Sequence, residues 1–321
     1  MVRKNRHPEY SELAISVVIC TYNRAELLAN ALQTLCEQTI NKSLYEVLVV
    51  DNNSMDNTRA LTEKFCRSYP NIRYCFEARQ GLSYARNRGW QEASGAYVAY
   101  IDDECKVPAK WLVVACQIIK KLAPAVFGGP YYGYHNSSTP RWWKKSYESF
   151  EHSKTSRALS DEEYLRGANI FIQRNLLAMI GGFNVELGMS GKKLAYGEEA
   201  HLQKRIRAIM HDDIIYYDPE LYIYHLIRPE KMTWRYILKS RFAGGRHIYT
   251  VFCDNTIKIP ILPQLQLLVQ TIITLFMFFG DILIGTLKRD RKQYPYLQNY
   301  LYEKTFGHVQ KLGIIYERYT H

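Results

Sequence analysis

Short apolar runs and longer amphipathic segments alternate along the first 130 residues. The apolar runs predict four buried strands, at residues 14–20, 45–50, 72–76 and 96–101. The segments beside them predict helices, at residues 25–38, 58–68, 82–93 and 109–122. Leu28, Leu32 and Leu35 show the helical spacing most clearly. This order predicts an α/β fold, in which a mostly parallel, Rossmann-like sheet carries helices on both faces.

Three of the predicted strands end on polar side chains. The first strand is followed by residues 21–24 (TYNR), the second by Asp51, and the fourth by the three acids at 102–104. Ligands of parallel sheets bind outside the carboxyl ends of the strands, so these groups predict one nucleotide-sized site. Crowded buried carboxylates repel one another, and a divalent cation carrying a diphosphate would relieve that repulsion. A polar loop that simply caps the strand is the alternative.

Each of these groups has a chemical role and a simpler alternative. Asp51 has the acceptor oxygens to bind a base N–H or a ribose hydroxyl, or it caps a helix. Four arginines have guanidinium groups suited to phosphate oxygens, and we expect at least one of them to be ordinary surface; they are Arg24, Arg79, Arg86 and Arg88. Gly81 would allow the backbone to approach a ligand closely.

Four segments carry a resemblance to a known family. They are ISVVICTYNR at 15–24, VVDNNSMD at 49–56, GLSYARNRGWQEASG at 81–95 and YIDDECKVPAKWL at 100–112. In this order and spacing they resemble family 2 glycosyltransferases of the GT-A fold. The resemblance covers about the first third of the chain. It implies an inverting transferase that uses a nucleotide-diphosphate sugar together with Mg²⁺ or Mn²⁺.

The resemblance also implies roles for particular residues. Thr21 would lie along the nucleotide, and Asp51 would hold the base. Asp102 and Glu104 match the first and third positions of the D-x-D motif, whose third acid is normally an aspartate that ligates the metal. Because this chain has glutamate at that position, the choice of metal stays open. Metal binding itself is still expected, since glutamate also provides an oxygen ligand. The predicted donor-binding residues are Thr21, Tyr22, Asn23, Arg24, Asp51, Gly81, Arg86, Asp102 and Asp103.

Two adjacent acids in the middle of the chain, Glu198 and Glu199, begin a predicted helix. Acids at a helix start suit its dipole, which is the structural interpretation. Alternatively, an inverting displacement needs a carboxylate to accept the proton of the attacking hydroxyl. In the family that this chain resembles, a GGF segment, here at 181–183, precedes G-E-D, whose second acid is the base. Glu199 is therefore the predicted base, with Glu198 as its catalytic neighbour.

Between these regions, residues 131–165 are rich in aromatic and charged side chains. They predict a long functional loop or lid, with a well-packed surface excursion as the equal alternative. Residues 167–172 predict an edge strand, and 174–180 a short helix. His225 ends a further apolar segment, 221–225. Histidine at such a strand in this fold class joins the metal or diphosphate in some proteins, although a structural role is the simpler interpretation. The predicted metal ligands are Asp102, Glu104 and His225.

The last quarter of the chain has a different pattern. Residues 231–247 predict a basic amphipathic helix, which the glycines at 244–245 interrupt or end. Residues 265–287 form an apolar run about long enough to cross a bilayer. Its polar residues fall on a narrow arc: Gln266, Gln270, Thr274, Asp281 and Gly285. Because basic residues flank both ends, we expect the helix to lie in the membrane surface, with a true span or a buried helix as alternatives.

Composition narrows the partners and the location. The net charge of +11 favours an anionic partner. Seven cysteines without a C-x-x-C pair indicate a reducing compartment, and the basic, polar residues 1–12 show no secretory signal. We therefore expect the chain at the cytoplasmic side of the cell membrane, peripheral or held by one hydrophobic helix, with a surface that binds anionic lipids. Nucleic acid is not an expected partner, because the charge lies beside apolar sequence.

Together these patterns predict an inverting glycosyltransferase that moves a sugar, from a UDP-sugar by preference, to a lipid-linked or polysaccharide hydroxyl. The donor half would be residues 1–130, the acceptor half 131–228, and the membrane-associated helices 229–321. One alternative is a nucleotidyltransferase, which would need a basic, glycine-rich triphosphate loop where residues 21–24 stand. Another is a non-catalytic module that docks on membranes.

Overall fold

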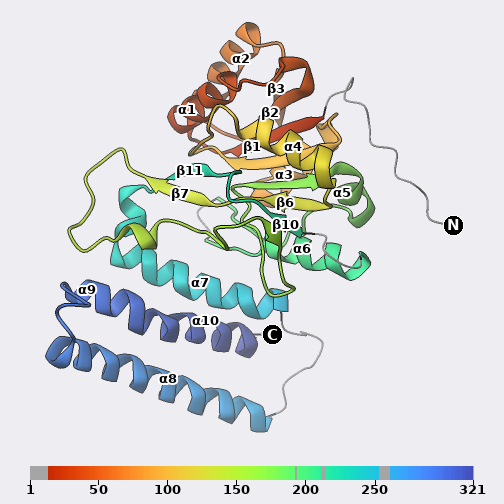
Figure 1. The fold of residues 1–321 in the computed structure, drawn as a ribbon. Helices are drawn as coiled ribbons and strands as arrows, with labels where there is room; N and C mark the ends of the chain where they lie inside the picture. Colours follow the sequence, from red (N-terminus) through yellow and green to blue (C-terminus); the bar gives the residue numbers. More distant parts are fainter. Residues whose placement is uncertain (1–13, 192–193, 211–214, 253–260, 321) are drawn as a thin grey trace. The chain divides into compact units, whose positions relative to one another are not determined.

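The computed structural model describes residues 14–191, 194–210, 215–252 and 261–320. The chain forms two compact units (Figure 1). The first comprises the described parts of Met1–Tyr134, Glu148–Gly191 and Glu198–Leu226, and the second comprises those of His135–Tyr147, Lys192–Gly197 and Ile227–His321. Residues 1–12, for which the sequence predicts no secretory signal, lie outside the described part of the chain.

The first unit contains an eight-stranded sheet in the order β3-β2-β1-β4-β9-β6-β10-β8. Strands β3, β2, β1 and β4 are parallel, as are β6 and β10, whereas β9 is antiparallel to both β4 and β6. The mostly parallel sheet predicted from the sequence is therefore confirmed. The strands are β1 Ile15–Thr21, β2 Tyr45–Asp51, β3 Ile72–Phe76, β4 Tyr97–Asp102, β6 Val126–Gly128, β8 Arg157–Ala158, β9 Ile170–Gln173 and β10 Ile215–Tyr217.

The strand predicted at 167–172 is not at an edge of the sheet. It is β9, which lies between β4 and β6. Pairing with a strand on each side leaves Ile170, Phe171 and Ile172 at most 1% exposed, so β9 buries apolar surface on both faces of the sheet.

Helices cover both faces of this sheet, as the sequence predicts. Alternate residues of each strand point to opposite faces. Val17 and Ile19 of β1 pack with α1, α2 and α4, whereas Val18 packs with α3, α5 and α6. The helices are α1 Ala25–Cys36, α2 Thr58–Ser68, α3 Leu82–Glu92, α4 Trp111–Leu122, α5 Arg174–Ile180 and α6 Glu198–Ile209, with the short η1 Lys42–Leu44 before β2.

A second, three-stranded sheet lies in the same unit, in the order β5-β11-β7. Its strands are β5 Cys105–Lys106, β7 Tyr131–Tyr134 and β11 Ile223–Leu226. Strand β11 is antiparallel to β5, and His225 pairs with Cys105 there. This pairing brings the histidine beside the acids that follow β4. Residues 131–165, predicted as a loop, contain β7, the turn η2 Lys145–Tyr147 and β8.

The second unit is helical, and α10 lies between α7 and α8 (Figure 1). Helix α7 does not end at the glycines 244–245, contrary to the sequence prediction. Gly245 instead allows close helix contact, because a Cβ there would collide with the carbonyl oxygen of Gln310. The elements are η3 Pro229–Met232, α7 Trp234–Phe252, α8 Ile261–Lys288, α9 Leu297–Tyr300, the π-helical turn η4 Leu301–Thr305 and α10 Phe306–Thr320.

Residues 135–147 belong to this helical unit rather than to the sheet. Trp142 stacks on Trp234 with ring centroids 5.3 Å apart, and Tyr147 stacks on Tyr302 at 4.1 Å. These rings join an apolar cluster around Phe306. Aromatic packing therefore holds the segment against α7, η4 and α10, a grouping that the division at residue 130 did not anticipate.

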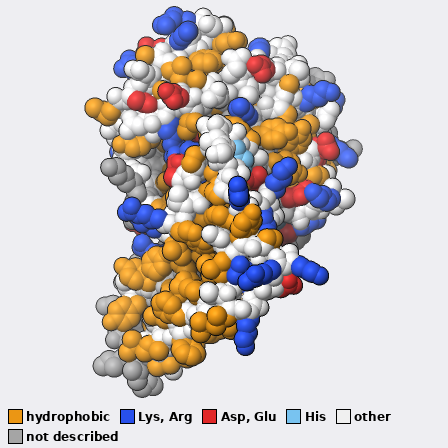
Figure 2. Space-filling view, turned by 90° about the vertical axis from the view of Figure 1, so that its left-hand side faces the viewer, with side chains coloured by type: hydrophobic (Ala, Val, Ile, Leu, Met, Phe, Trp, Pro, Cys, Tyr) orange, Lys and Arg blue, Asp and Glu red, His pale blue; other side chains and the backbone are white. Residues whose placement is uncertain are grey.

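Helix α8 buries only a narrow stripe of its surface. Gln266–Lys288 is long and apolar enough to cross a membrane, and only 11% of its most apolar 18-residue stretch is buried. The buried stripe includes Leu267 and Thr274, which are 2% and 1% exposed. Asp281, partly buried, lies 2.8 Å from Nε2 of His308 on α10. Figure 2 shows hydrophobic side chains gathered over the surface of the helical unit.

Candidate active site

The register of the sheet places the polar strand ends side by side. Thr21 at the end of β1 pairs with Asp51 at the end of β2, and Cys20 pairs with Asp102 at the end of β4. The three ends predicted to share one edge therefore do so. Parallel pairing fixes this arrangement, because each strand enters the sheet in the same direction.

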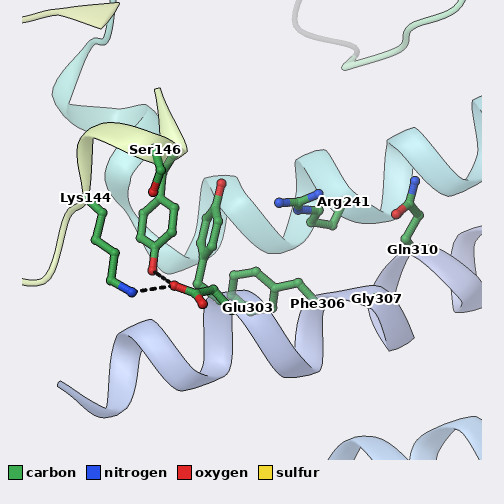
Figure 3. Close-up of a pocket in the computed structure, with 9 residues that line it drawn as sticks. Lys144, Ser146, Arg241, Glu303, Phe306, Gly307 and Gln310 are labelled. Atoms are coloured by element: carbon green, nitrogen blue, oxygen red, sulfur yellow. Dashed lines mark hydrogen bonds and ion pairs between the residues drawn. The ribbon is translucent and has the colours of Figure 1, made fainter. Parts of the chain in front are cut away.

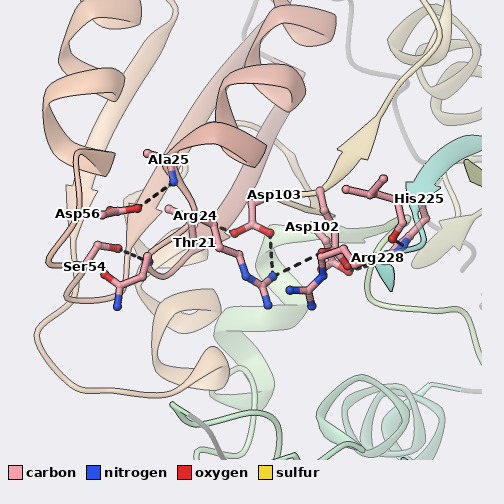
Figure 4. Close-up of polar contacts among 12 residues, drawn as sticks. Thr21, Arg24, Ala25, Ser54, Asp56, Asp102, Asp103, His225 and Arg228 are labelled. Atoms are coloured by element: carbon pink, nitrogen blue, oxygen red, sulfur yellow. Dashed lines mark hydrogen bonds and ion pairs between the residues drawn. The ribbon is translucent and has the colours of Figure 1, made fainter. Parts of the chain in front are cut away.

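A hydrogen-bonded network joins the first and fourth strand ends (Figure 4). The hydroxyl of Thr21 donates to Oδ2 of Asp103 at 2.8 Å, and Nη1 of Arg24 donates to Oδ1 at 3.1 Å. The same guanidinium nitrogen lies 3.8 Å from Oε2 of Glu104. Burial raises the pKa of Asp103 to about 6, against the opposing effects of Arg24 and Thr21. Asp103 thus anchors the loop, and Asp102 lies on its more exposed side.

The residues predicted to hold a metal converge on one another. Nε2 of His225 lies 3.3 Å from Oδ2 of Asp102 and 3.6 Å from Oε1 of Glu104. Asp102 is the accessible member, with 36% of its side chain exposed, against 3% for Glu104. Two carboxylates and an imidazole form an oxygen-rich donor set that fits Mn²⁺ or Mg²⁺. The structure also brings Cys105 into the group, since its Sγ lies within 4.8 Å of ligand atoms of Asp102 and His225.

The loops after β1 and β2 are joined by side-chain hydrogen bonds. The backbone N–H of Asn23 donates to Oγ of Ser54 at 2.9 Å, and Oδ1 of Asn23 accepts from the N–H of Met55 at 2.7 Å. Asp56 accepts from the N–H of Ala25 at 3.0 Å. Asn23 has a positive φ of 53°, which this pairing stabilises. Tyr22 beside it is partly buried.

Asp51 is 2% exposed and already accepts two hydrogen bonds. The N–H of Ser54 donates to Oδ1 at 2.8 Å, and the hydroxyl of Tyr74 donates to Oδ2 at 2.9 Å. A carboxylate has about four acceptor positions, so capacity for a base N–H remains. The adjacent Asn52, which sequence reasoning did not single out, accepts from the N–H of Gly81 at 2.8 Å and so ties the third loop to the second.

The four arginines considered as phosphate ligands separate into two pairs. Arg79 and Arg88 are 65% and 44% exposed at the side chain and pair locally with Glu77 and Glu92, as expected of ordinary surface residues. Arg24 lies at the strand ends. Arg86, by contrast, is buried, with a side chain 4% exposed.

Arg86 links α3 to the acid pair at the start of α6. Its Nη1 lies 2.8 Å from Oε1 of Glu198 and 3.8 Å from Oε2 of Glu199. The two acids differ in access, because the side chain of Glu198 is 5% exposed and that of Glu199 is 23% exposed. The N–H of Gly167 donates to Oε1 of Glu199 at 3.3 Å. One guanidinium therefore faces both predicted catalytic acids.

The two acids also differ in proton affinity. Burial, together with the negative charge of Glu199, raises the pKa of Glu198. Burial acts in the same sense on Glu199, but Arg86 and backbone N–H groups outweigh it, so the pKa of Glu199 is lowered. When the pKa values of two neighbouring carboxyl groups differ in this way, one group keeps its proton and the other is ionised, so that only the second can act as a base. The accessible member, Glu199, is the ionised one.

Sequence reasoning missed Cys105 and the hydrogen bond from Arg86 to Glu198. Cys105 directly follows the acids at 102–104, but a thiol is not a typical ligand for the cation expected there. The partnership of Arg86 with Glu198 crosses more than one hundred residues, and neither residue carries a local signal of it.

The sequence pattern of "Glycosyl transferase family 2" matches residues 16–179. This is just over half of the 321 residues, and the chain belongs to that family. Family membership confirms the prediction of a glycosyltransferase, and it removes support from the nucleotidyltransferase and docking-module alternatives.

Particular relatives share part of this chain. Glycosyltransferase AglE of Haloferax volcanii is 32% identical over 60% of this chain and 60% of its own length. The glucosyl-dolichyl phosphate glucuronosyltransferase of the same organism is 26% identical over 64% of this chain and 66% of its own. The chain thus covers less than two thirds of either relative.

A solved structure shares the fold. The mannosyltransferase PcManGT of Pyrobaculum calidifontis, in complex with GDP-Man and Mn²⁺, has a TM-score of 0.58 at 16% identity. The likeness covers 95% of this chain and 73% of that one. Together with the sheet order, it confirms the GT-A fold predicted from the sequence.

Proposed function

We propose that this protein is a metal-assisted, inverting glycosyltransferase that moves a sugar from a nucleotide-diphosphate donor to a hydroxyl of a lipid-linked or polysaccharide acceptor. The observation that carries the proposal is the convergence of Thr21, Asp51 and Asp102 at one sheet edge. Family membership supports the transferase chemistry. The relative that acts on a glucosyl-dolichyl phosphate supports a lipid-linked acceptor.

The donor would occupy the strand ends. Asp51 would accept from the base, and uridine is the favoured base because its ring N–H suits a carboxylate acceptor. Thr21 and the 22–24 loop would lie along the nucleotide, with Gly81 at close backbone approach. Arg24 would meet phosphate oxygens. Arg86 was predicted for the same task, but its guanidinium is buried against Glu198, so we assign it the acid pair instead.

The metal would be held by Asp102, Glu104 and His225, with Asp103 fixing the loop that carries them. Mn²⁺ or Mg²⁺ bound there supplies positive charge to the diphosphate as it leaves with the bonding electron pair. The donor complex of PcManGT with Mn²⁺ supports this assignment, since the two proteins share a fold. Neither ion is preferred on the residues alone.

Glu199 would act as the general base. It is ionised and accessible, so it can accept the proton of the acceptor hydroxyl as that oxygen bonds to the anomeric carbon. The bond from that carbon to the diphosphate breaks on the opposite side, which inverts the configuration. Glu198 holds its proton because of burial and of its charged neighbour. Arg86 faces both carboxyls and keeps Glu199 ionised.

The helical unit would bind the membrane surface. The exposed side chains of α8 are mostly apolar, and they include Phe276 at 79% and Leu287 at 70%. The polar groups Thr274 and Asp281 face the protein, and α10 contacts the same stripe. A lone span would leave this stripe in lipid, so we favour a helix lying in the interface at the cytoplasmic side.

A thermal-shift experiment tests the donor assignment. Uridine diphosphate with Mn²⁺ should raise the melting temperature of the full chain more than the guanosine, adenosine or cytidine diphosphates do. Asp51→Ala should abolish that preference, whereas Arg79→Gln, which removes an exposed charge nearby, should keep it. Equal shifts with every base, or no shift with any, would contradict the proposal.

A further inference from the structure

A groove of about 600 Å³ opens on the helical unit, and none of the residues assigned so far lines it. Its lining comes from the 144–147 segment, from α7, from η4 and from the start of α10 (Figure 3). Arg241, Tyr302 and Gln310 present polar atoms, and Phe306 adds apolar surface. A volume of this size suits a small-molecule ligand.

Two of the charged groups in this groove pair with each other, and the third, on Arg241, contacts only an aromatic ring in the described part of the chain. Glu303 is satisfied, because Nζ of Lys144 lies 2.6 Å from Oε1 and the hydroxyl of Tyr147 donates to the same oxygen at 2.5 Å. Arg241 lies over the ring of Tyr302, with Cζ 5.2 Å from the centroid. Within the described residues, its guanidinium has no carboxylate or hydrogen-bond partner. The lining therefore carries one net positive charge, on a group suited to phosphate.

The aromatic floor of the groove continues to the apolar helix. Tyr302 and Phe306 belong to one cluster with Trp234, and Phe278 of α8 packs against that cluster. Packed helices lie about 8–10 Å apart. If α8 lies at the boundary of headgroups and acyl chains, α10 and the groove beside it are at or just above headgroup depth. A ligand there can keep its chain in the bilayer.

We propose that this groove binds the phosphate or diphosphate of a sugar-carrying lipid, with Arg241 as the phosphate ligand and the rings of Tyr147 and Tyr302 beside the first sugar. The inference rests on the proposed function and assigns the acceptor's anchoring site. An ordinary anionic phospholipid satisfies the charge of Arg241 but leaves the volume and the aromatic rings without a role. A sugar fills the volume and lies along the edges of the two rings, which line the groove.

Vesicle binding by the full chain tests the inference. The probes are phosphatidylcholine vesicles that contain a sugar-carrying polyprenyl diphosphate, the sugar-free polyprenyl monophosphate or, at matched total charge, phosphatidylglycerol. The wild-type chain should bind the first about tenfold more tightly than the last, because only the sugar-carrying lipid can place its phosphate on Arg241 and its sugar beside the aromatic rings at the same time. Arg241→Gln should remove that preference, and Arg241→Lys should keep most of it.

Lys239→Gln is the matched control. It removes one exposed positive charge from the same helix, two residues away, and should leave the preference intact. Equal losses in Arg241→Gln and Lys239→Gln would overturn the inference, as would a wild-type chain without preference between the lipids. If Arg241→Gln fails to fold by circular dichroism, Gln310→Glu places a negative charge in the groove and should give the same loss.

The same preparations separate this inference from the proposed function. The nucleotide site lies in the first unit, so stabilisation by uridine diphosphate and Mn²⁺ is an independent measurement. Nucleotide binding without a lipid preference removes the anchoring site and leaves the transferase. A lipid preference without nucleotide binding removes the transferase and leaves the anchoring site.

Discussion

The two units of this molecule distribute apolar residues in opposite ways. In the first, Val17 and Ile19 of β1 are fully buried between sheet and helices, and polar groups occupy the edge where the strands end. In the second, Phe276 and Phe279 of α8 are 79% and 63% exposed, whereas Thr274 on the same helix is 1% exposed. Burial of apolar surface stabilises the first unit, and the large exposed apolar face of α8 is the observation behind the proposed contact of the second unit with lipid.

This contrast separates two kinds of chemical task. The sheet edge concentrates charge where a metal and a diphosphate would bind, and it needs strands held in exact register to do so. The helical unit needs only a narrow polar stripe, because its exposed face would gain its free energy from transfer into lipid. The predictions below test each side of the contrast against the other.

The largest expected effect is on the acid pair. Glu199→Gln should lower kcat by about 10³, because it removes the general base. Glu198→Gln should lower it far less, since the amide resembles the protonated acid that burial favours at this position. Steady-state transfer assays check both, with nucleotide binding unchanged as the control. A Glu199→Gln enzyme with full activity would remove the assignment.

The next effect concerns the exposed face of α8. Phe276→Glu combined with Phe279→Glu should weaken binding to anionic vesicles by about 100-fold or more, since each buried aromatic contributes roughly 1.5–3 kcal/mol. Co-flotation with liposomes measures it. Met179→Glu alters an exposed apolar residue of the first unit, 69% exposed on α5, and should change nothing. Unchanged flotation of the double variant would contradict the interfacial helix.

A smaller effect is expected at the proposed metal ligands. His225→Ala should weaken Mn²⁺-dependent nucleotide binding by about tenfold or more, because one of three converging ligands is lost. Cys105→Ser, which alters the thiol of the same group, should have a lesser effect, since oxygen ligands suit the ion better. Calorimetric titration with and without Mn²⁺ distinguishes them. A greater loss in the Cys105 variant would mean that the thiol is the ligand.

The smallest effect is on stability. Because the pKa of Glu198 is raised in the folded state, folding favours its protonated form. That contribution is complete below the unfolded pKa of about 4.5 and is lost as the pH rises through the folded value. The free energy of unfolding should therefore fall less with rising pH in Glu198→Gln than in the wild type, by about 1 kcal/mol or more over this range. Urea unfolding across that range measures it, and identical slopes for both proteins would show that Glu198 folds ionised.

Much of the sheet could be predicted because its signals are local. The apolar runs ending on Thr21, Asp51 and Asp102 fixed both the strands and the edge at which they meet. The burial of β9 between two strands could not be predicted, because its short apolar run fits an edge or an interior place equally. The partnership of Arg86 with Glu198 depends on contacts between distant elements, and so does the packing of Trp142 on Trp234.

The helical unit shows the same limit. The polar arc of α8 could be predicted from residue spacing, but its partner on α10, His308, lies 27 residues further along the chain. Gly245 has the local character of a helix stop, and packing against α10 overrides that preference. Long-range contacts of this kind decide where a glycine ends a helix and where it permits two helices to approach.

The central claim is that Asp102, Glu104 and His225 hold a metal against a nucleotide diphosphate. The most direct measurement is anomalous diffraction from a crystal of the protein grown with uridine diphosphate and Mn²⁺. The account predicts one manganese peak at Asp102, Glu104 and His225, next to the diphosphate, with the uracil beside Asp51. A manganese peak elsewhere, or a nucleotide bound away from this edge, would contradict it.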